Sequence, residues 1–170
     1  GSSERPFGIE RTNLKFFPSE YHSQAPLWMA LDLHKQIAAR DIESVEVQTY
    51  FTAWSEIGSA PELWHPQTRE TADHSLPYLL ALALMDGRIA TTSFDDARLQ
   101  DPATLAVMNR IVIAENPDYT RHYPDKLLTR IELLTRDGRR IEISAQYPKG
   151  HALNPMSDDD VNTKFVMTCD

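Results

Sequence analysis

The most apolar stretch of the chain runs from Leu76 to Asp86 and consists of Leu, Ala and Met apart from one proline, one tyrosine and the final aspartate. An apolar segment of this length without a polar face is typical of a helix that is buried on all sides. Asp73 or Ser75 can cap its start, Pro77 fits its first turn, and Gly87 supplies a left-handed stop. The pattern therefore predicts a central helix that is nearly inaccessible to water.

A two-residue alternation of apolar and polar positions marks the strands. The clearest signal is Asp137-Gly138 between two alternating runs, residues 127–135 and 139–147. A two-residue Asp-Gly linker between such runs predicts a β-hairpin with a tight turn. Three further strands are predicted at residues 7–17, 45–51 and 111–115.

The remaining segments read as helices and loops. Pro26 lies just inside a helix predicted for residues 25–40, and Asp101-Pro102 opens a short helix through residue 108. Residues 94–99 are expected to form one turn. The last helix starts at Ser157, which can pair with Asp160 in a capping box. Its apolar stripe consists of Val161, Phe165 and Cys169, and loops are predicted at residues 52–71 and 116–125.

These elements predict an α+β fold of two layers, in which a mostly antiparallel sheet of four or five strands carries helices packed on one face. No repeat, low-complexity tract or domain boundary interrupts residues 1–170, so a single domain is expected. The apolar stripe of the last helix is still in progress at Asp170. We therefore expect the domain to be cut from a longer chain.

The composition of the chain excludes several classes of function. The 17 basic and 25 acidic residues give a net charge of −8, which argues against a nucleic-acid partner. The longest apolar run is too short to span a bilayer and no signal peptide opens the sequence, so we expect no membrane partner and a cytoplasmic protein. Cys169 alone excludes an internal disulfide and cannot hold an iron–sulfur cluster. None of the six histidines stand as H-x-x-x-H, so no metal is expected.

Two segments concentrate ionisable side chains. Arg69, His74 and Tyr78 flank the start of the central helix, and the last two share a face if that helix extends back one turn. The alternative is a capping histidine beside a core tyrosine. The second segment, Lys15 to Gln24, crowds Lys, Glu, His and Gln into a turn between a predicted strand and a helix. Such a junction is a common place for function, and a solvated turn is the alternative.

Three stretches resemble motifs of the MmgE/PrpD family, whose type member is 2-methylcitrate dehydratase. KFFPSEYHSQ at residues 15–24 is similar to the family segment K-x-x-P-x-E-x-H-x-Q. RETADHSLPY at residues 69–78 matches the signature R-x-x-x-D-H-S-x-x-Y, and GHALNPMSDDDVNTKF at residues 150–165 resembles the family's C-terminal motif. The three matches follow the family order across nearly the whole chain. The resemblance is to the lid domain alone, because family members also contain an all-helical domain.

The resemblance implies a dehydratase that removes water from a citrate-type tricarboxylic acid without a cofactor, in a cleft between lid and helical domain. It further implies a homodimer in the cytoplasm, or in the mitochondrial matrix of a eukaryote. Cations must hold the carboxylates, a base must take a proton, and an acid must protonate the leaving hydroxyl. The lid alone is expected to be inactive, because the helical domain supplies much of this acid–base set.

The resemblance also assigns roles. Lys15 matches the family's lid lysine, for carboxylate binding or proton transfer, and Tyr78 matches the signature tyrosine, a donor to the substrate or leaving group. We expect these two side chains to share one cleft-facing surface. His74 is a further catalytic candidate. The candidates for substrate binding are Glu20, His22, Gln24 and Arg69.

Two alternatives stay open. Related cis-aconitate decarboxylases carry histidines where this chain has Glu20 and Gln24, which favours the dehydratase, and iminodisuccinate epimerases also belong to the family. A hypothesis from a different functional class is that the domain is a stand-alone binding or dimerisation module, which uses an aromatic loop with Trp54 and Trp64. Such a module would not expose a large apolar patch when alone, whereas a lid would.

Overall fold

The structure, a computed structural model, describes residues 8–169. Its strands β1 (Ile42–Thr49), β2 (Ile111–Glu115), β3 (Thr129–Thr135) and β4 (Arg140–Ala145) form one sheet in the order β2-β1-β3-β4. β1 runs parallel to β2, and the β1–β3 and β3–β4 pairs are antiparallel. The prediction of a mostly antiparallel sheet is therefore confirmed.

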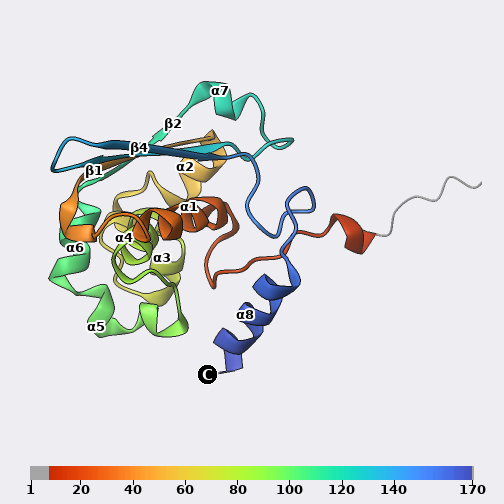
Figure 1. Ribbon diagram of the computed structural model, residues 1–170, viewed down its shortest axis with the longest axis horizontal. Coiled ribbons are helices and arrows are strands. Elements are labelled where there is room, and N and C mark those ends of the chain that lie inside the picture. The colour runs from red at the N-terminus through yellow and green to blue at the C-terminus, as the bar shows by residue number, and fades with distance from the viewer. Residues whose placement is uncertain (1–7, 170) are drawn as a thin grey trace, which may run out of the picture.

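One face of the sheet is buried, as the alternation of apolar and polar residues along β1 and β3 requires. Val45 and Val47 of β1 and Ile131 and Leu133 of β3 are buried, whereas the residues between them are more exposed. Figure 1 shows the sheet edge-on with the long helices beneath it. The helices of at least seven residues are α1 (Gln24–His34), α2 (Phe51–Ile57), α4 (Leu76–Asp86), α6 (Pro102–Met108) and α8 (Asp158–Cys169).

The central helix α4 has the predicted bounds and the predicted burial. Ser75 caps it by accepting a hydrogen bond from the backbone N–H of Tyr78, and Gly87 ends it in the left-handed region at φ 65°. Leu80 and Leu84 are 0% and 1% exposed, and every residue from Leu76 to Leu84 is buried, which confirms that the helix is nearly inaccessible. α1 packs on α4 and on the sheet. The two helices thus fill the space under the strands.

The hairpin is also confirmed. Gly138 adopts φ 86°, where a glycine is favoured, and its N–H donates to the Thr135 carbonyl at 2.9 Å. α6 begins at Pro102 after the Asp101 cap, and α8 begins after Ser157. In that capping box the Asp160 N–H donates to Ser157 Oγ at 3.2 Å and the Ser157 N–H donates to Asp160 Oδ2 at 2.9 Å.

The predicted strand at residues 7–17 is wrong. Residue 7 lies outside the described residues, and the segment that follows is the 3-10 helix η1 (Gly8–Arg11) and an irregular turn. Phe16 and Phe17 are adjacent and both buried, which a strand with a single buried face cannot achieve because its side chains alternate between faces. Their N–H groups both donate to one side chain, Gln24, instead of to a neighbouring strand.

α1 ends earlier than predicted, at His34, because the chain turns there and buries Ile37 in the core before η3 (Ala39–Asp41). The predicted loops also contain short helices. Residues 52–71 hold most of α2, with η4 (Pro61–Trp64) and the start of α3 (Arg69–Asp73). The other short elements are η2 (Tyr21–Ser23), η5 (Thr91–Phe94), α5 (Asp96–Leu99) and α7 (Pro117–Thr120).

Candidate functional site

The Lys15–Gln24 segment is shaped by the buried amide of Gln24. Its Oε1 accepts hydrogen bonds from the N–H groups of Phe16 at 2.9 Å and Phe17 at 3.0 Å. Its Nε2 donates to the carbonyl of Phe17 at 3.3 Å and to Ser19 Oγ at 3.2 Å. Gln24 is 0% exposed. The amide thus satisfies the backbone of the turn and does not face solvent, and the expectation that Gln24 binds substrate stays a prediction.

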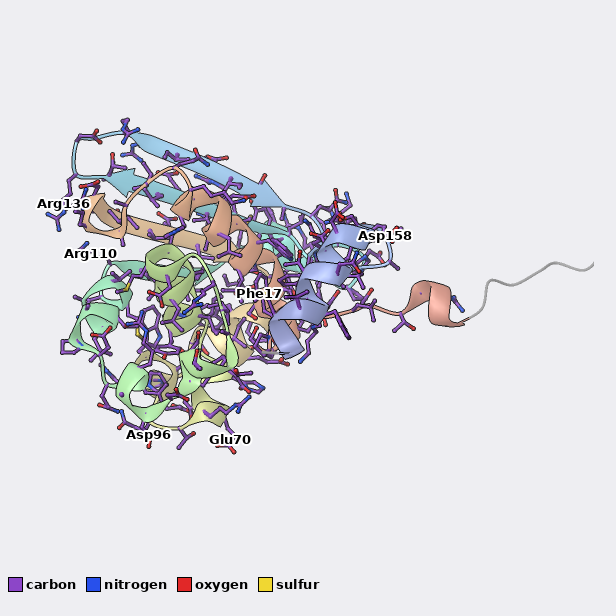
Figure 2. All side chains as sticks on the ribbon, turned by 60° about the horizontal axis from the view of Figure 1, so that its bottom comes forward. Phe17, Glu70, Asp96, Arg110, Arg136 and Asp158 are labelled. Carbon is purple, nitrogen blue, oxygen red and sulfur yellow. The ribbon has the colours of Figure 1, made fainter. Side chains whose placement is uncertain are left out.

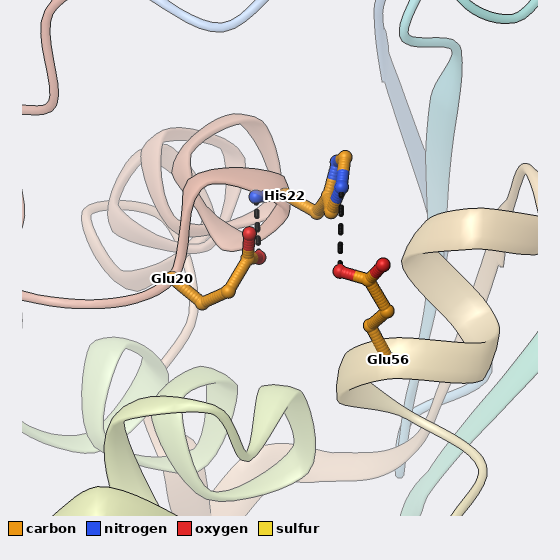
Figure 3. Close-up of side chains that lie close together, drawn as sticks. All are labelled: Glu20, His22 and Glu56. Atoms are coloured by element: carbon orange, nitrogen blue, oxygen red, sulfur yellow. Dashed lines mark hydrogen bonds and ion pairs between the residues drawn. The ribbon is translucent and has the colours of Figure 1, made fainter.

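Glu20 and His22 point from η2 toward α2 and form a polar cluster with Glu56 (Figure 3). Glu20 caps η2, since its Oε2 accepts from the His22 N–H at 2.5 Å. His22 Nδ1 lies 2.5 Å from the Tyr50 hydroxyl, and Nε2 lies 3.7 Å from Glu56 Oε2. The imidazole is therefore held between a buried phenol and a half-exposed carboxylate.

This cluster offers two kinds of chemistry. Burial raises the pKa of Tyr50, with the neighbouring Tyr123 adding to the shift, so the phenol stays protonated and can orient the imidazole. His22 can then exchange a proton at Nε2, beside Glu56. One histidine and two carboxylates, with ligand atoms within 4.8 Å of one another, also form a donor set that a divalent cation accepts. The expectation that no metal takes part stays a prediction.

Lys15 is exposed, and the described residues provide no carboxylate that pairs with its ammonium. Its backbone carbonyl accepts a hydrogen bond from Lys164 Nζ of α8 at 2.6 Å. Burial lowers the pKa of Lys164, and the nearby charge of Lys15 lowers it further. Two cations therefore lie close together at one edge of the domain. A small hollow there is lined by Phe16, Pro18, Ile89, Ala90, Thr91, Lys164 and Met167.

Tyr78 lies in the core and does not share that surface. It is 0% exposed, and its hydroxyl donates to the Ser93 carbonyl at 2.6 Å. Burial raises its pKa to about 12. Because its hydroxyl is buried, Tyr78 does not present its polar end on an open surface with Lys15, and its role as a donor to the substrate stays a prediction. The environment of Tyr78 matches the alternative interpretation, in which it is a tyrosine of the hydrophobic core.

His74 and Arg69 belong to α3, a separate helix. His74 is its C-cap, so it does not continue into α4 and does not share a helical face with Tyr78. The exposed imidazole contacts the Asp73 carboxylate and the Glu70 carbonyl. Arg69 is exposed, with its guanidinium 5.7 Å from the ring centre of Phe94. Both side chains are open to solvent.

The two N-terminal motifs nevertheless meet. The Glu20 N–H donates to the Asp73 carbonyl at 3.0 Å, which brings η2 against the end of α3. Glu20, His22 and His74 thus come from neighbouring segments, whereas Gln24 and Tyr78 are buried. Sequence reasoning missed Lys164, Glu56 and Tyr50 as neighbours of these residues. Lys164 stands inside the third motif, so that motif was the available signal for it.

None of the helices among the described residues is both long and apolar enough to cross a bilayer. A family model, described as the MmgE/PrpD C-terminal domain, matches residues 17–170. The chain is 32% identical over 163 residues to a 2-methylcitrate dehydratase of Salmonella typhimurium, covering 88% of this chain and 33% of that protein. It is 30% identical over 162 residues to the enzyme of that name from Cupriavidus necator, covering 87% and 33%.

A mitochondrial 2-methylcitrate dehydratase of Yarrowia lipolytica is 29% identical over 162 residues, with 87% of this chain and 31% of that protein covered. The chain therefore spans about a third of the length of the curated relatives that it matches. The family model covers nearly every residue from the buried Phe17 to the end of α8. On these matches the chain belongs to the MmgE/PrpD family, through its C-terminal domain.

Proposed function

We propose that this domain is the substrate-covering part of a hydro-lyase that dehydrates 2-methylcitrate or a closely related tricarboxylic acid. The observation that carries the proposal is the exposed side chain of Lys15 beside Lys164, whose ammonium donates to the Lys15 carbonyl at 2.6 Å, in a domain whose net charge is −8. A local cationic site in an acidic protein is suited to an anionic ligand. The names of the relatives supply the chemical class of that ligand.

The charge of each candidate side chain determines the role that we propose for it. Lys15 binds a substrate carboxylate, and Arg69 is a second cation for the same task. Glu20 is less suited to that task, because its carboxylate would repel those of the substrate. We therefore assign Glu20 and His22 to proton transfer. In this assignment His22, oriented by Tyr50, takes or returns a proton at Nε2, and Glu56 stabilises the charged imidazolium. His74 remains a further candidate.

The rest of the site is proposed to come from another domain of the longer protein. Support comes from α8, on which Val161, Val166 and Met167 are each more than 40% exposed. An apolar surface of this kind fits a domain that docks against a partner. The aromatic anchors that a stand-alone module would need are not free, because Trp54 and Trp64 pack against the core. The domain alone is expected to show no turnover.

The decisive experiment uses the full-length enzyme with 2-methylcitrate, citrate and cis-aconitate as separate substrates. Lys15→Ala should lower dehydration by about a hundredfold, because a charge-assisted hydrogen bond to the transition state is worth on the order of 3 kcal/mol. Lys35→Ala removes an exposed lysine that pairs with Asp32 and serves as the matched control. Carbon dioxide release from cis-aconitate without dehydration of 2-methylcitrate would instead assign the domain to a decarboxylase.

A further inference from the structure

Lys164 joins two parts of the chain that are far apart in sequence. Its ammonium donates to the backbone carbonyl of Lys15 at 2.6 Å and to that of Phe16 at 2.9 Å, across 149 and 148 residues. Figure 1 shows α8 beside the N-terminal segment, and Figure 2 places α8 next to the labelled Phe17. Lys164 therefore connects α8 to the backbone that carries the proposed substrate-binding lysine.

The Lys15 segment needs such a contact because it is irregular. Its amides are held elsewhere: the Leu14 N–H donates to the Gly150 carbonyl at 2.8 Å, and the Phe16 and Phe17 N–H groups donate to Gln24. Those contacts leave the carbonyls of residues 15 and 16 on the other side of the turn, and Lys164 contacts both. A cation that bonds two successive carbonyls fixes the peptide plane between them.

The first turn of α8 holds Lys164 in place. Asp160 forms the capping box with Ser157 and accepts a hydrogen bond from Lys149 Nζ at 3.0 Å. The Lys149 ammonium also lies 4.2 Å from the ring centre of Trp28 in α1. α8 thus has one attachment through Lys149 at its start and a second through Lys164, one turn further along.

We propose that Lys164 is a positioning residue that fixes the backbone of Lys15 and so aims its ammonium at the substrate carboxylate. The inference rests on the proposed function of Lys15. Lys164 acts through Lys15 and does not itself need to touch the substrate. A displacement of about 1 Å in such a group can cost up to a hundredfold in rate, so the contact has a large kinetic consequence.

The test combines kinetics and hydrogen exchange in the full-length enzyme. Lys164→Met should lower kcat/KM for 2-methylcitrate tenfold to a hundredfold, on the order expected for a misplaced binding group. Lys164→Arg keeps a cationic donor and should stay within about fivefold of the parent. Lys149→Met removes the other lysine that attaches α8 and is the matched control, with kcat/KM expected within about threefold of the parent.

A double-mutant cycle separates positioning from independent binding. If Lys164 acts through Lys15, the Lys15→Ala/Lys164→Met enzyme should be no slower than Lys15→Ala alone. Amide hydrogen exchange of the peptide over residues 12–17 should also speed up in Lys164→Met and not in Lys149→Met.

Each contrary outcome has a distinct meaning. Multiplicative effects in the cycle, or unchanged exchange at residues 12–17, overturn the positioning role while leaving the proposed role of Lys15 intact. If Lys15→Ala does not lower turnover, the proposed role of Lys15 fails and the positioning inference falls with it. An equal loss in Lys149→Met would show that Lys164 only docks α8, which also overturns the inference.

Discussion

The imidazole of His34 lies directly against Gly87, so that a Cβ added at Gly87 would come within 2.5 Å of two ring atoms. His34 is the last residue of α1, and its Nδ1 is hydrogen-bonded to the carbonyl of Leu84 in α4 at 2.9 Å. Gly87 therefore has two tasks. It ends α4 in the left-handed region, and it leaves space for the side chain that joins the two core helices.

Gly87→Ala should lower the free energy of unfolding by about 2 to 3 kcal/mol, because a left-handed alanine costs about 1 to 2 kcal/mol and the ring of His34 must also move. Gly138→Ala is the control, since Gly138 also has a positive φ and no atom within 4 Å of an added Cβ. It should cost only the backbone part, about 1 to 2 kcal/mol. Urea unfolding measures both variants, and equal losses would exclude a contribution from His34.

Gln24→Leu should be strongly destabilising. The substitution leaves the buried N–H groups of Phe16 and Phe17 without their acceptor. An unsatisfied buried donor costs about 1 to 3 kcal/mol, so we expect a loss of about 2 to 4 kcal/mol in urea unfolding. Gln36→Leu is the matched control, since among the described residues this exposed amide donates to the carbonyl of Asp32 alone, and its change should stay within about 0.5 kcal/mol. Comparable losses in both variants would contradict the structural role of Gln24.

The sequence predicts the fold well where a pattern is long and has clear ends. α4 combines a continuous apolar run with a serine cap and a glycine stop, so its bounds could be predicted. α2 was missed because only Ala53 and Ile57 are buried in its seven residues, and the glycine and prolines that follow indicate a loop. The strand predicted before Pro18 failed for a different reason. A side chain of α1 satisfies its amides, and no local pattern shows that.

The site is harder to predict than the fold, because a motif identifies residue types and does not say what they face. Gln24 and Tyr78 stand in the expected motifs, yet both satisfy backbone groups inside the domain. The role of Lys164 is not visible in the sequence because its acceptors lie 148 and 149 residues away. Glu56 lies in α2, where the sequence pattern predicts a loop. Burial and long-range contacts therefore show what each candidate side chain faces, and the catalytic and binding roles stay predictions.

Tyr78→Phe should reduce stability. The substitution removes the hydrogen bond from the buried hydroxyl to the Ser93 carbonyl and leaves that acceptor without this donor. We expect the free energy of unfolding to fall by about 1 to 2 kcal/mol in a urea titration. Tyr147→Phe is the control, because its hydroxyl donates to the Asp125 carbonyl at an exposed position, and its change should be below about 0.5 kcal/mol. An unchanged stability in Tyr78→Phe would argue against this core role.

The attachment of α8 should weaken in acid through Asp160. Burial raises the pKa of this carboxyl, but hydrogen bonds from the Ser157 N–H, from Lys149 and from the Ser157 hydroxyl outweigh that effect and hold the pKa below its usual range. A carboxylate with a lowered pKa stabilises the fold above its unfolded pKa, and this stabilisation is lost as the pH falls through the folded value. Asp160→Asn should therefore lower the free energy of unfolding by about 1 kcal/mol at pH 7, the usual contribution of a helix cap. The difference in stability between this variant and the parent should close below about pH 4.

Asp159→Asn is the control, because it removes a charge from the same turn of α8 without touching the capping box. Urea unfolding of the three proteins between pH 3 and pH 7, about the range over which carboxylates titrate, provides the comparison. A gap for Asp160→Asn that is independent of pH would show that Asp160 acts through the shape of its side chain and not through its charge.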